Sequence, residues 1–460
     1  MSDFELKSGL VMSRLRSDDE SWSHTPDYAT FNQQLTQAKI DQVYAAILAE
    51  GTGDSAAVED AYTRTSHFVE RSFNMYENRS QLEQPIERAF AVPMRIMRND
   101  ESYASEVLPF VPLLDPEFGV NSDVRQRSLV GLPPLILDTY LQSSDPQRRG
   151  ALVLTPLFGD MERDLVTSKG RLRRKYQQWK LGRLASRNIN ETARFIHEQL
   201  GASVAGLGAI IPSVTKFGTT IKQEGLTTTT GHGGTVHLIV ETAKKIINDT
   251  SLPQDAKIGV IGGAGSIGYS SVDVIANSLP EHRITTYDKN EARLQQLVHD
   301  HPSTSRINIK NNALDVLRSS HVIITAVTTK IDLDANDPNF ELDLRGKYII
   351  DDSQPGCFDR DQVEARGGKL LWVVGEDGSA DKFLTRDNGY NFGDEAGIRG
   401  TSAIWGCEAE AGVIAASGEY HKALRERVNP RHARIIGELC TAYSVSIAPY
   451  QSFGQPVQIG

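Results

Sequence analysis

Apolar positions in the central third of the chain fall in short runs that alternate with amphipathic stretches. The runs predict strands over residues 257–262, 283–287, 306–309, 321–326, 347–351 and 370–374. The stretches between them predict helices over residues 267–278, 290–299 and 312–318. Because strands that alternate with helices build a parallel sheet covered on both faces, this pattern predicts an α/β fold with a doubly wound sheet.

The flanking regions have other patterns. Residues 30–49 and 56–76 carry apolar residues at mixed three- and four-residue spacing, which predicts two helices. Residues 91–166 are rich in proline and strand formers, which predicts an irregular α+β region. Further helices are expected over residues 188–200, over residues 236–248 with Thr235 as the N-cap, and over residues 430–444.

One loop of the central region carries a chemical signal. The segment Lys257–Gly268, KIGVIGGAGSIG, places Gly263, Gly265 and Gly268 in a G-x-G-x-x-G pattern between a predicted strand and a predicted helix. In such loops the first glycine permits a tight turn, the second lets the backbone approach a pyrophosphate, and the third lets the helix pack against the strand. The phosphates then bind the free N–H groups of the helix N-terminus. We therefore predict a dinucleotide-binding (Rossmann) domain; the alternative is a glycine-rich loop of another α/β protein.

Further residues complete the predicted cofactor site. Asp288 ends the second strand, 20 residues after Gly268, where a carboxylate binds the ribose hydroxyls of a dinucleotide. The fourth strand ends at the carboxyl edge of the sheet, which also meets the cofactor. The predicted contacts are Gly263, Gly265, Ser266, Ile267, Gly268, Asp288, Lys289, Thr325 and Val327.

Composition and charge restrict the class of protein. The chain has 460 residues, of which 39% are hydrophobic and 23% charged, as in ordinary globular proteins. The net charge of −10 argues against nucleic acid as the main partner. Three cysteines suggest neither a disulfide framework nor a Cys-rich metal site, which favours a cytoplasmic location. No apolar run approaches the length of a membrane span, and the first 20 residues lack a signal-peptide pattern.

A basic run interrupts this acidic chain. Eight Lys and Arg residues between Lys169 and Arg187 occur without one acid, and Tyr176 and Trp179 lie among them. A basic surface of this kind can bind an acidic carrier protein or the phosphates of coenzyme A. The alternative is a solvated helix face.

Two segments carry candidate reactive side chains. Residues 226–235, LTTTTGHGGT, form a predicted loop of hydroxyls and glycines with His232, which, like His237 just after it, is either an acid–base group or an ordinary polar residue. Cys407 falls near the start of a predicted helix, where the dipole favours its thiolate. Its alternative is a small buried residue, as predicted for Cys440. Cys357 lies in a predicted loop.

Taken together, these segments resemble the long-chain acyl-[acyl-carrier-protein] reductases of cyanobacteria, which make fatty aldehydes. The resemblance extends discontinuously over residues 150–455. The matching segments are GLGAIIPSV from Gly206, TTGHGGT from Thr229, GGAGSIG from Gly262, IDDSQP from Ile350, GCEAEA from Gly406 and ARIIGE from Ala433.

The resemblance implies reduction of an acyl thioester to an aldehyde. In that family the cysteine of the C-x-x-E-A motif is the nucleophile that takes the acyl chain, and this residue is Cys407 here. Hydride from the nicotinamide then reduces the acyl group, with His232 or Glu410 as candidates to manage the proton. Residues 203–214 would line the acyl site. The basic run would dock an acyl carrier protein or coenzyme A thioester.

This sequence departs from the family pattern at three places. The family has asparagine after T-T-G, where this chain has His232. The family tends to carry arginine after the second strand and uses NADPH, whereas this chain has Asp288 and Lys289. A carboxylate favours NADH, but Lys289 or Arg293 can receive a 2′-phosphate, so both NADH and NADPH stay open. The N-terminal region has no counterpart, so the acyl substrate stays open too.

The expected organisation has four parts. These are a helical N-terminal extension (1–90), a substrate or acyl-binding α+β domain (91–235), a Rossmann NAD(P)-binding domain (236–385), and the catalytic-cysteine helix with C-terminal helices that pack back on the substrate domain (386–460). Three other functions stay open: a dehydrogenase of shikimate or amino-acid type without covalent catalysis, a non-enzymatic dinucleotide sensor, and a reductase of a specialised acyl group. Homo-oligomerisation also stays open.

Overall fold

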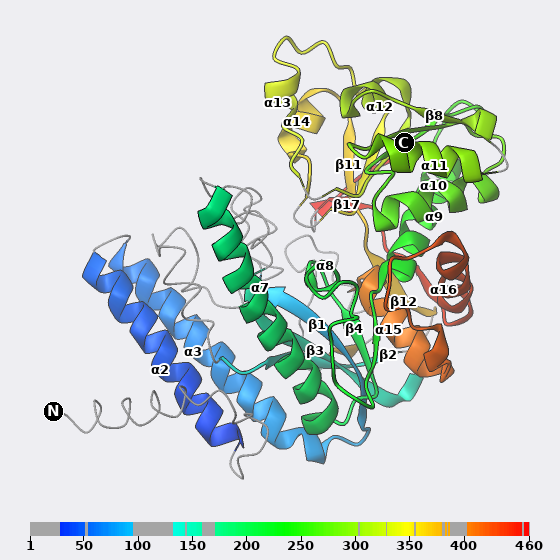
Figure 1. Ribbon diagram of the computed structural model, residues 1–460. Coiled ribbons are helices and arrows are strands. Elements are labelled where there is room, and N and C mark those ends of the chain that lie inside the picture. The colour runs from blue at the N-terminus through cyan, green and yellow to red at the C-terminus, as the bar shows by residue number, and fades with distance from the viewer. Residues whose placement is uncertain are drawn as a thin grey trace.

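In the described part of the chain, two α/β lobes each contain a six-stranded sheet (Figure 1). The computed structural model describes residues 28–50, 54–94, 132–142, 145–158, 171–301, 304–327, 329–353, 356–379, 382–383, 385–386, 403–452 and 455–459. Figure 1 shows α2, α3 and α7 at one end of the molecule, α11 to α14 at the other, and α9 and α15 between them.

The second lobe confirms the predicted doubly wound sheet. Its parallel strands are β6 (Ile258–Ile261), β7 (Ile284–Tyr287), β8 (Ile307–Ile309), β9 (Val322–Thr325), β10 (Tyr348–Asp351) and β11 (Lys369–Trp372). They lie in the order β11-β10-β9-β6-β7-β8, which is the strand order of dinucleotide-binding folds. The helices between them include α10 (Ser266–Ser278), α11 (Glu291–Asp300) and α12 (Ala313–Ser319). Every predicted strand and helix of this region lies within two residues of its predicted ends.

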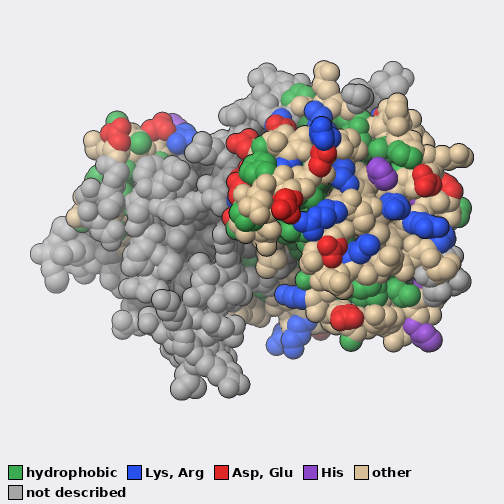
Figure 2. All heavy atoms as spheres, turned by 90° about the horizontal axis from the view of Figure 1, so that it is seen from above, with side chains coloured by type: hydrophobic (Ala, Val, Ile, Leu, Met, Phe, Trp, Pro, Cys, Tyr) green, Lys and Arg blue, Asp and Glu red, His purple; other side chains and the backbone are tan. Residues whose placement is uncertain are grey.

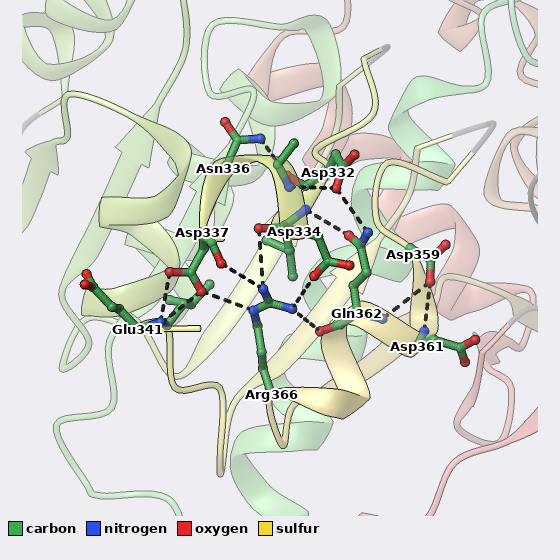
Figure 3. A network of polar contacts seen from close by, with 12 residues as sticks. Asp332, Asp334, Asn336, Asp337, Glu341, Asp359, Asp361, Gln362 and Arg366 are labelled. Carbon is green, nitrogen blue, oxygen red and sulfur yellow. Dashed lines mark hydrogen bonds and ion pairs between the residues drawn. The ribbon is translucent and has the colours of Figure 1, made fainter. Parts of the chain in front are cut away.

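Two short helices of this lobe were not predicted from the sequence pattern. α13 (Leu333–Asn336) and α14 (Arg360–Ala365) are joined by Arg366, whose side chain is only 1% exposed. Its Nε donates to Asp337 Oδ2 at 3.2 Å and its Nη1 to Asp334 Oδ1 at 3.0 Å, with further bonds to main-chain carbonyls (Figure 3). A buried guanidinium surrounded by acceptors in this way holds the β9–β10 connection against the β10–β11 connection.

The first lobe has a mixed sheet in the order β14-β2-β3-β1-β4-β5. The strands are β1 (Ile86–Met94), β2 (Leu135–Gln142), β3 (Asp145–Phe158), β4 (Val204–Leu207), β5 (Thr227–Thr229) and β14 (Thr385–Arg386). β3, β1, β4 and β5 run parallel, whereas β2 is antiparallel to both of its neighbours. β1 begins at Ile86, so this sheet takes residues from both sides of the division expected at residue 90.

Helices cover this first sheet. α2 (Tyr28–Glu50) and α3 (Ser55–Asn78) confirm the two helices predicted near the N-terminus and pack on each other, and α3 lies against β2. α7 (Arg171–Arg194) lies against β3 and continues into a π-helical turn, Phe195–Gln199, so the helix predicted over residues 188–200 is the end of a longer one. A short helix, α8 (Ile211–Val214), follows β4.

Three helices connect the two lobes. α9 (His232–Asp249) packs against α10, against α15 (Gly406–Ser417) and against α16 (Pro430–Ala442). α15 in turn lies against β1 and β4 of the first sheet. A small antiparallel sheet joins β12 (Gly375–Ser379) to β13 (Lys382–Phe383), β15 (Ala403–Ile404) and β16 (Val445–Ile447). A final hairpin pairs β17 (Gln451–Ser452) with β18 (Gln455–Pro456).

The predicted start of α9 is wrong. The sequence predicts Thr235 as the N-cap, but the helix begins at His232 and its N-cap is Gly231, with φ of +74°. Thr235 lies inside the helix, where its hydroxyl donates to the carbonyl of Gly231. The glycines at positions 233 and 234 are therefore helical, although glycine disfavours a helix, because a tertiary contact to Gly234 described below stabilises this turn.

A bilayer requires a helix that is both long and apolar. Among the helices that the structure describes, none combines the length and the apolar character of a membrane-spanning segment.

Candidate functional site

The glycine-rich loop after β6 has the form of a phosphate-binding turn. Gly262, with φ of +94°, makes the left-handed turn, so this role falls one residue before the predicted Gly263. A Cβ on Gly263 would overlap Thr286 Oγ1, and one on Gly268 would overlap the carbonyl oxygen of Gly262. Gly265, the N-cap of α10, is the most open of them, since a Cβ there would come no closer than 3.0 Å to other atoms. The least crowded glycine of the loop thus lies at a helix N-terminus, where backbone N–H groups bind anions.

Asp288 lies beside this loop at the end of β7. Its Oδ2 accepts a hydrogen bond from the N–H of Ala264 at 3.1 Å, and its Oδ1 accepts one from the N–H of Asn290 at 2.9 Å. Lys289 is exposed, and the guanidinium of Arg293 lies 5.2 Å from the centre of the Tyr269 ring. The carboxylate is therefore placed where the adenosine ribose of a dinucleotide lies in this fold.

The loops after β9 and β10 lie at the carboxyl edge of the sheet, next to the glycine-rich loop. Val327 is partly buried against Gly262, and its N–H donates to Ser353 Oγ at 3.2 Å. Thr325 is fully buried and its hydroxyl donates to Asp351 Oδ1 at 2.8 Å. This hydroxyl therefore stabilises the protein structure and does not face the predicted cofactor site. Of the two, Val327 is the residue that contacts the glycine loop.

Asp351 organises the loop that contains Cys357. Its carboxylate is buried and accepts hydrogen bonds from the N–H groups of Ser353 and Cys357 at 2.9 and 2.7 Å. Burial raises the pKa of Asp351, and burial together with the charge of Asp351 raises the pKa of the Cys357 thiol well above its ordinary value. Cys357 is therefore a protonated, buried thiol and a poor nucleophile.

Cys407 lies where the N-termini of α9 and α15 meet. It is the second residue of α15 and is partly exposed. Gly231 contacts it so closely that a Cβ on Gly231 would overlap the Cβ of Cys407. Gly406 is packed with similar closeness, since a Cβ there would lie 2.6 Å from both N and Cα of Thr235. The prediction that Cys407 begins a helix is confirmed, and the structure adds a second helix N-terminus beside it.

His232 connects this crossing to the glycine-rich loop. Its Nδ1 lies 3.1 Å from Oγ of Ser266, the first residue of α10, and Ser266 Oγ accepts the N–H of Val428 at 3.1 Å. Burial, reinforced by nearby His432, lowers the pKa of His232 to about 4. His232 is therefore neutral at physiological pH, with one ring nitrogen as donor and the other as acceptor.

An aromatic side chain that the sequence did not single out packs on His232. The Phe217 ring meets the imidazole edge-on, at 6.1 Å between centroids, and the guanidinium of Arg427 lies 5.5 Å from the centre of the Phe217 ring. Phe217 has φ of +61°, and Lys216 and Ala209 of the same segment are also left-handed. Such conformations are uncommon for residues with side chains and concentrate near functional sites.

Glu410 is fully buried one turn after Cys407. Its Oε2 accepts a hydrogen bond from the N–H of Gly234 at 2.9 Å, and its Oε1 accepts one from the hydroxyl of Thr229. The structure thus brings Cys407, His232 and Glu410 to one junction of helices. Both carboxylate oxygens of Glu410, however, already accept hydrogen bonds from the protein. Thr229 was missed as a site residue because its role depends on a contact across 181 positions of sequence.

The other candidates, His237 and Cys440, are buried residues of α9 and α16. His237 is buried, and its Nδ1 would lie 3.2 Å from a Cβ on Gly437 of α16. Burial lowers its pKa. Cys440 of α16 is fully buried, as predicted, and burial with the charges of Glu410 and Asp377 raises its pKa. Both side chains serve packing.

The stretch from Ser203 to Val214 forms β4 and α8. β4 is buried between β1 and β5. Gly206 packs there so that a Cβ would lie 2.9 Å from both Phe90 and Ala411, and 3.2 Å from the carbonyl oxygen of Cys407. This stretch therefore lies directly behind the first turn of α15.

The basic run forms the first three quarters of α7 and the residues before it. Lys169 and the side chains of residues 171–181, including Tyr176 and Trp179, lie outside the described residues. Arg183 and Arg187 are exposed. Burial and, to a smaller extent, the charge of Arg187 lower the pKa of Lys39 of α2 to about 8, so these two cations lie near each other. On the face seen in Figure 2, by contrast, the described Lys and Arg side chains are interspersed with Asp and Glu.

Comparisons with known proteins find distant structural similarity. No protein-family model matches the chain, and no curated protein matches it. The chain is similar to an imine reductase from Bacillus cereus (17% identity over 28% of this chain and 46% of that one, TM-score 0.20). It is also similar to one of the polypeptides of dipicolinate synthase from Bacillus halodurans (18%, 40% and 60%, TM-score 0.26) and to D-arabinose dehydrogenase from Sulfolobus solfataricus (13%, 32% and 46%, TM-score 0.24).

The chain thus spans about half of the length of these three solved structures. At these TM-scores the similarity assigns neither a family nor a function to the chain. The fold assignment rests on the strand order and the glycine-rich loop described above.

Proposed function

We propose that this protein is an NAD(P)H-dependent oxidoreductase that reduces an acyl thioester to an aldehyde through an acyl-Cys407 intermediate. One arrangement carries the proposal: Cys407 contacts Gly231, and the next residue, His232, is bonded to Ser266 at the N-terminus of the dinucleotide helix. Only Gly231 and His232 therefore separate a partly exposed thiol at a helix N-terminus from Ser266 of the glycine-rich loop. The resemblance to acyl-[acyl-carrier-protein] reductases supplies the acyl thioester as substrate.

The dinucleotide fits the residues present. The open backbone at Gly265 and the first turn of α10, with Ser266 and Ile267, would hold the pyrophosphate. Asp288 would hold the adenosine ribose, and Val327 would lie along the path to the nicotinamide. When bound, the nicotinamide would supply the hydride that converts the acyl group on Cys407 to an aldehyde.

The chain supplies the covalent chemistry. The thiolate of Cys407 attacks the thioester carbonyl carbon, a new C–S bond forms, the original C–S bond breaks, and the carrier leaves as a thiol after taking a proton. The N-termini of α9 and α15 both place partial positive charge near this sulfur and near the oxygen that becomes negative during attack. His232, neutral and bonded to Ser266, is an acid–base group that directly follows Gly231, the residue in contact with Cys407, and that contacts the first residue of α10.

Intact-protein mass spectrometry tests the proposal. The protein is mixed with a long-chain acyl thioester in the absence of cofactor. We expect an acyl-sized mass increase that Cys407→Ala abolishes and that NADH or NADPH discharges as aldehyde. Cys440→Ala serves as the matched control, because that thiol is buried in the core and should not carry the acyl group. Absence of an increase with several chain lengths, on both acyl carrier protein and coenzyme A, would favour direct hydride transfer to a different substrate.

The proposal includes docking of an acidic carrier on α7. The exposed side chains of Arg183 and Arg187 support this assignment. Charge reversal at both arginines should raise KM for acyl carrier protein thioesters several-fold, more at low salt than at high salt, with kcat unchanged. The same KM effect with a small acyl thioester that has no carrier would contradict docking.

A further inference from the structure

We infer that Glu410 is a positioning residue of the proposed site, which holds the N-terminus of α9 against the first turn of α15 and so keeps Cys407 in contact with Gly231, the residue before His232. This inference rests on the proposed function for its link to turnover. It replaces the expectation that Glu410 takes part in proton transfer.

The N-terminus of α9 needs an external acceptor. Helix N-termini leave their first N–H groups without partners in the helix, and Ser, Thr, Asp or Asn at the N-cap usually binds one of them. The N-cap of α9 is Gly231, which has no side chain for this task. The N–H of Gly234, three residues later, instead donates to Glu410 Oε2 at 2.9 Å. A carboxylate from α15 therefore caps α9.

The other oxygen of Glu410 connects to two further segments. Oε1 accepts the hydroxyl hydrogen of Thr229, at the end of β5. Thr229 Oγ1 in turn accepts the N–H of Leu424 at 3.2 Å. Glu410 is fully buried, so its charge is compensated by these donors and by the positive end of the α9 dipole. Both carboxylate oxygens thus bind the framework around Cys407.

Close packing transmits this bond to Cys407. Glu410 lies three residues after Cys407 and therefore on the same side of α15. Gly231, Gly234 and Gly406 bring the two helices into backbone contact, and Gly233 brings α9 within 2.9 Å of Glu410 Oε2, measured from the position of a Cβ. Because glycines form the α9 side of this contact, loss of the carboxylate leaves Gly234 N–H without its acceptor and lets α9 move away from Cys407.

Alkylation kinetics test this inference without any acyl substrate. The rate of iodoacetamide reaction at Cys407, located by peptide mass mapping, is followed from about pH 5 to about pH 10, the range in which thiols titrate. Cys357 and Cys440 are buried, so they stay unreacted while the protein is folded and report unfolding if they react. Glu438→Ala, at an exposed position of α16, is the control variant.

Two variants at position 410 separate positioning from proton transfer. Gln keeps the shape, and its carbonyl can accept from Gly234 while its amide donates to Thr229. We expect Glu410→Gln to keep the alkylation profile and to keep turnover within about threefold, whereas Glu410→Ala moves the profile to higher pH and lowers turnover about 100-fold. Loss of turnover in Glu410→Gln with an unchanged alkylation profile would assign Glu410 to proton transfer and overturn the inference. An unchanged profile in Glu410→Ala would overturn it too.

A third variant decides the case if Glu410→Ala exposes the buried thiols. Thr229→Val removes one hydrogen bond to Glu410 and keeps the shape of the side chain. It should move the alkylation profile in the same direction by a smaller amount, and no movement would contradict the inference. The proposed function fails separately, if no acyl adduct forms on Cys407 in the unmodified protein.

Discussion

The contact between Gly406 and α9 makes a quantitative test of the helix crossing. In Gly406→Ala, the new Cβ would lie 2.6 Å from N and from Cα of Thr235 and 2.8 Å from the carbonyl carbon of Gly234. All three are backbone atoms of a buried helix, so no side chain can rotate away. Because carbon atoms pack at about 3.5 Å or more, α15 and α9 must separate by roughly 1 Å.

The magnitude follows from two opposing terms. Alanine in place of glycine in a helix stabilises by about 0.5–1 kcal/mol. Overpacking of a close contact costs about 1–3 kcal/mol, and a displacement of about 1 Å at a reacting group lowers the rate about 100-fold. We therefore expect Gly406→Ala to be destabilised by about 0–2.5 kcal/mol and to lose nearly all aldehyde formation.

A control variant measures the helix-propensity gain of a glycine-to-alanine change without any overpacking. Gly182 lies in α7 at an exposed position with no atom within 4 Å of a Cβ. Gly182→Ala should stabilise the protein by about 0.5–1 kcal/mol and leave activity unchanged toward a small acyl thioester that has no carrier to dock on α7. Urea unfolding followed by circular dichroism measures both variants, and aldehyde release measures activity. If Gly406→Ala is as stable and as active as Gly182→Ala, the helices are not in backbone contact and the reasoning about Cys407 is wrong.

Three further predictions concern separate parts of the structure. His232 protonates at its ordinary pKa of 6.5 when unfolded but only at about 4 when folded, so stability falls as the pH drops from 6.5 to 4, by up to about 3 kcal/mol. His232→Asn should flatten this slope in urea unfolding at each pH, and an equal slope would contradict the burial of a neutral imidazole. Asp288→Asn keeps an acceptor for Ala264 N–H but removes the negative charge that repels a 2′-phosphate. The ratio of NADPH affinity to NADH affinity, measured by cofactor fluorescence, should therefore rise roughly tenfold. An unchanged ratio would place the adenosine ribose elsewhere. Arg366→Met leaves Asp337, which is 3% exposed, without its cation and should cost about 3–5 kcal/mol in urea unfolding, with part of the loss recovered by adding Asp337→Asn.

Local patterns in the sequence determined the dinucleotide lobe. The central strands β6, β9 and β10 are short, mostly apolar runs because they are buried between helices on both faces, and such runs are visible without knowledge of neighbours. The glycine-rich loop and Asp288 were predictable for the same reason: strand, turn, helix and next strand follow one another along the chain. The position of Cys407 at a helix start also depends on local sequence.

Tertiary structure alone decided how the site is assembled. The start of α9 was misplaced by four residues because its cap is Glu410, which lies 176 positions away in the sequence and looks like an ordinary helical glutamate there. Thr229, Ser266 and Phe217 acquire their roles through similar long-range contacts. Hydrophobic periodicity reports which face of an element is buried, but not which other element covers it. The meeting of the two helix N-termini at Cys407 therefore follows from packing between glycines that no local pattern pairs.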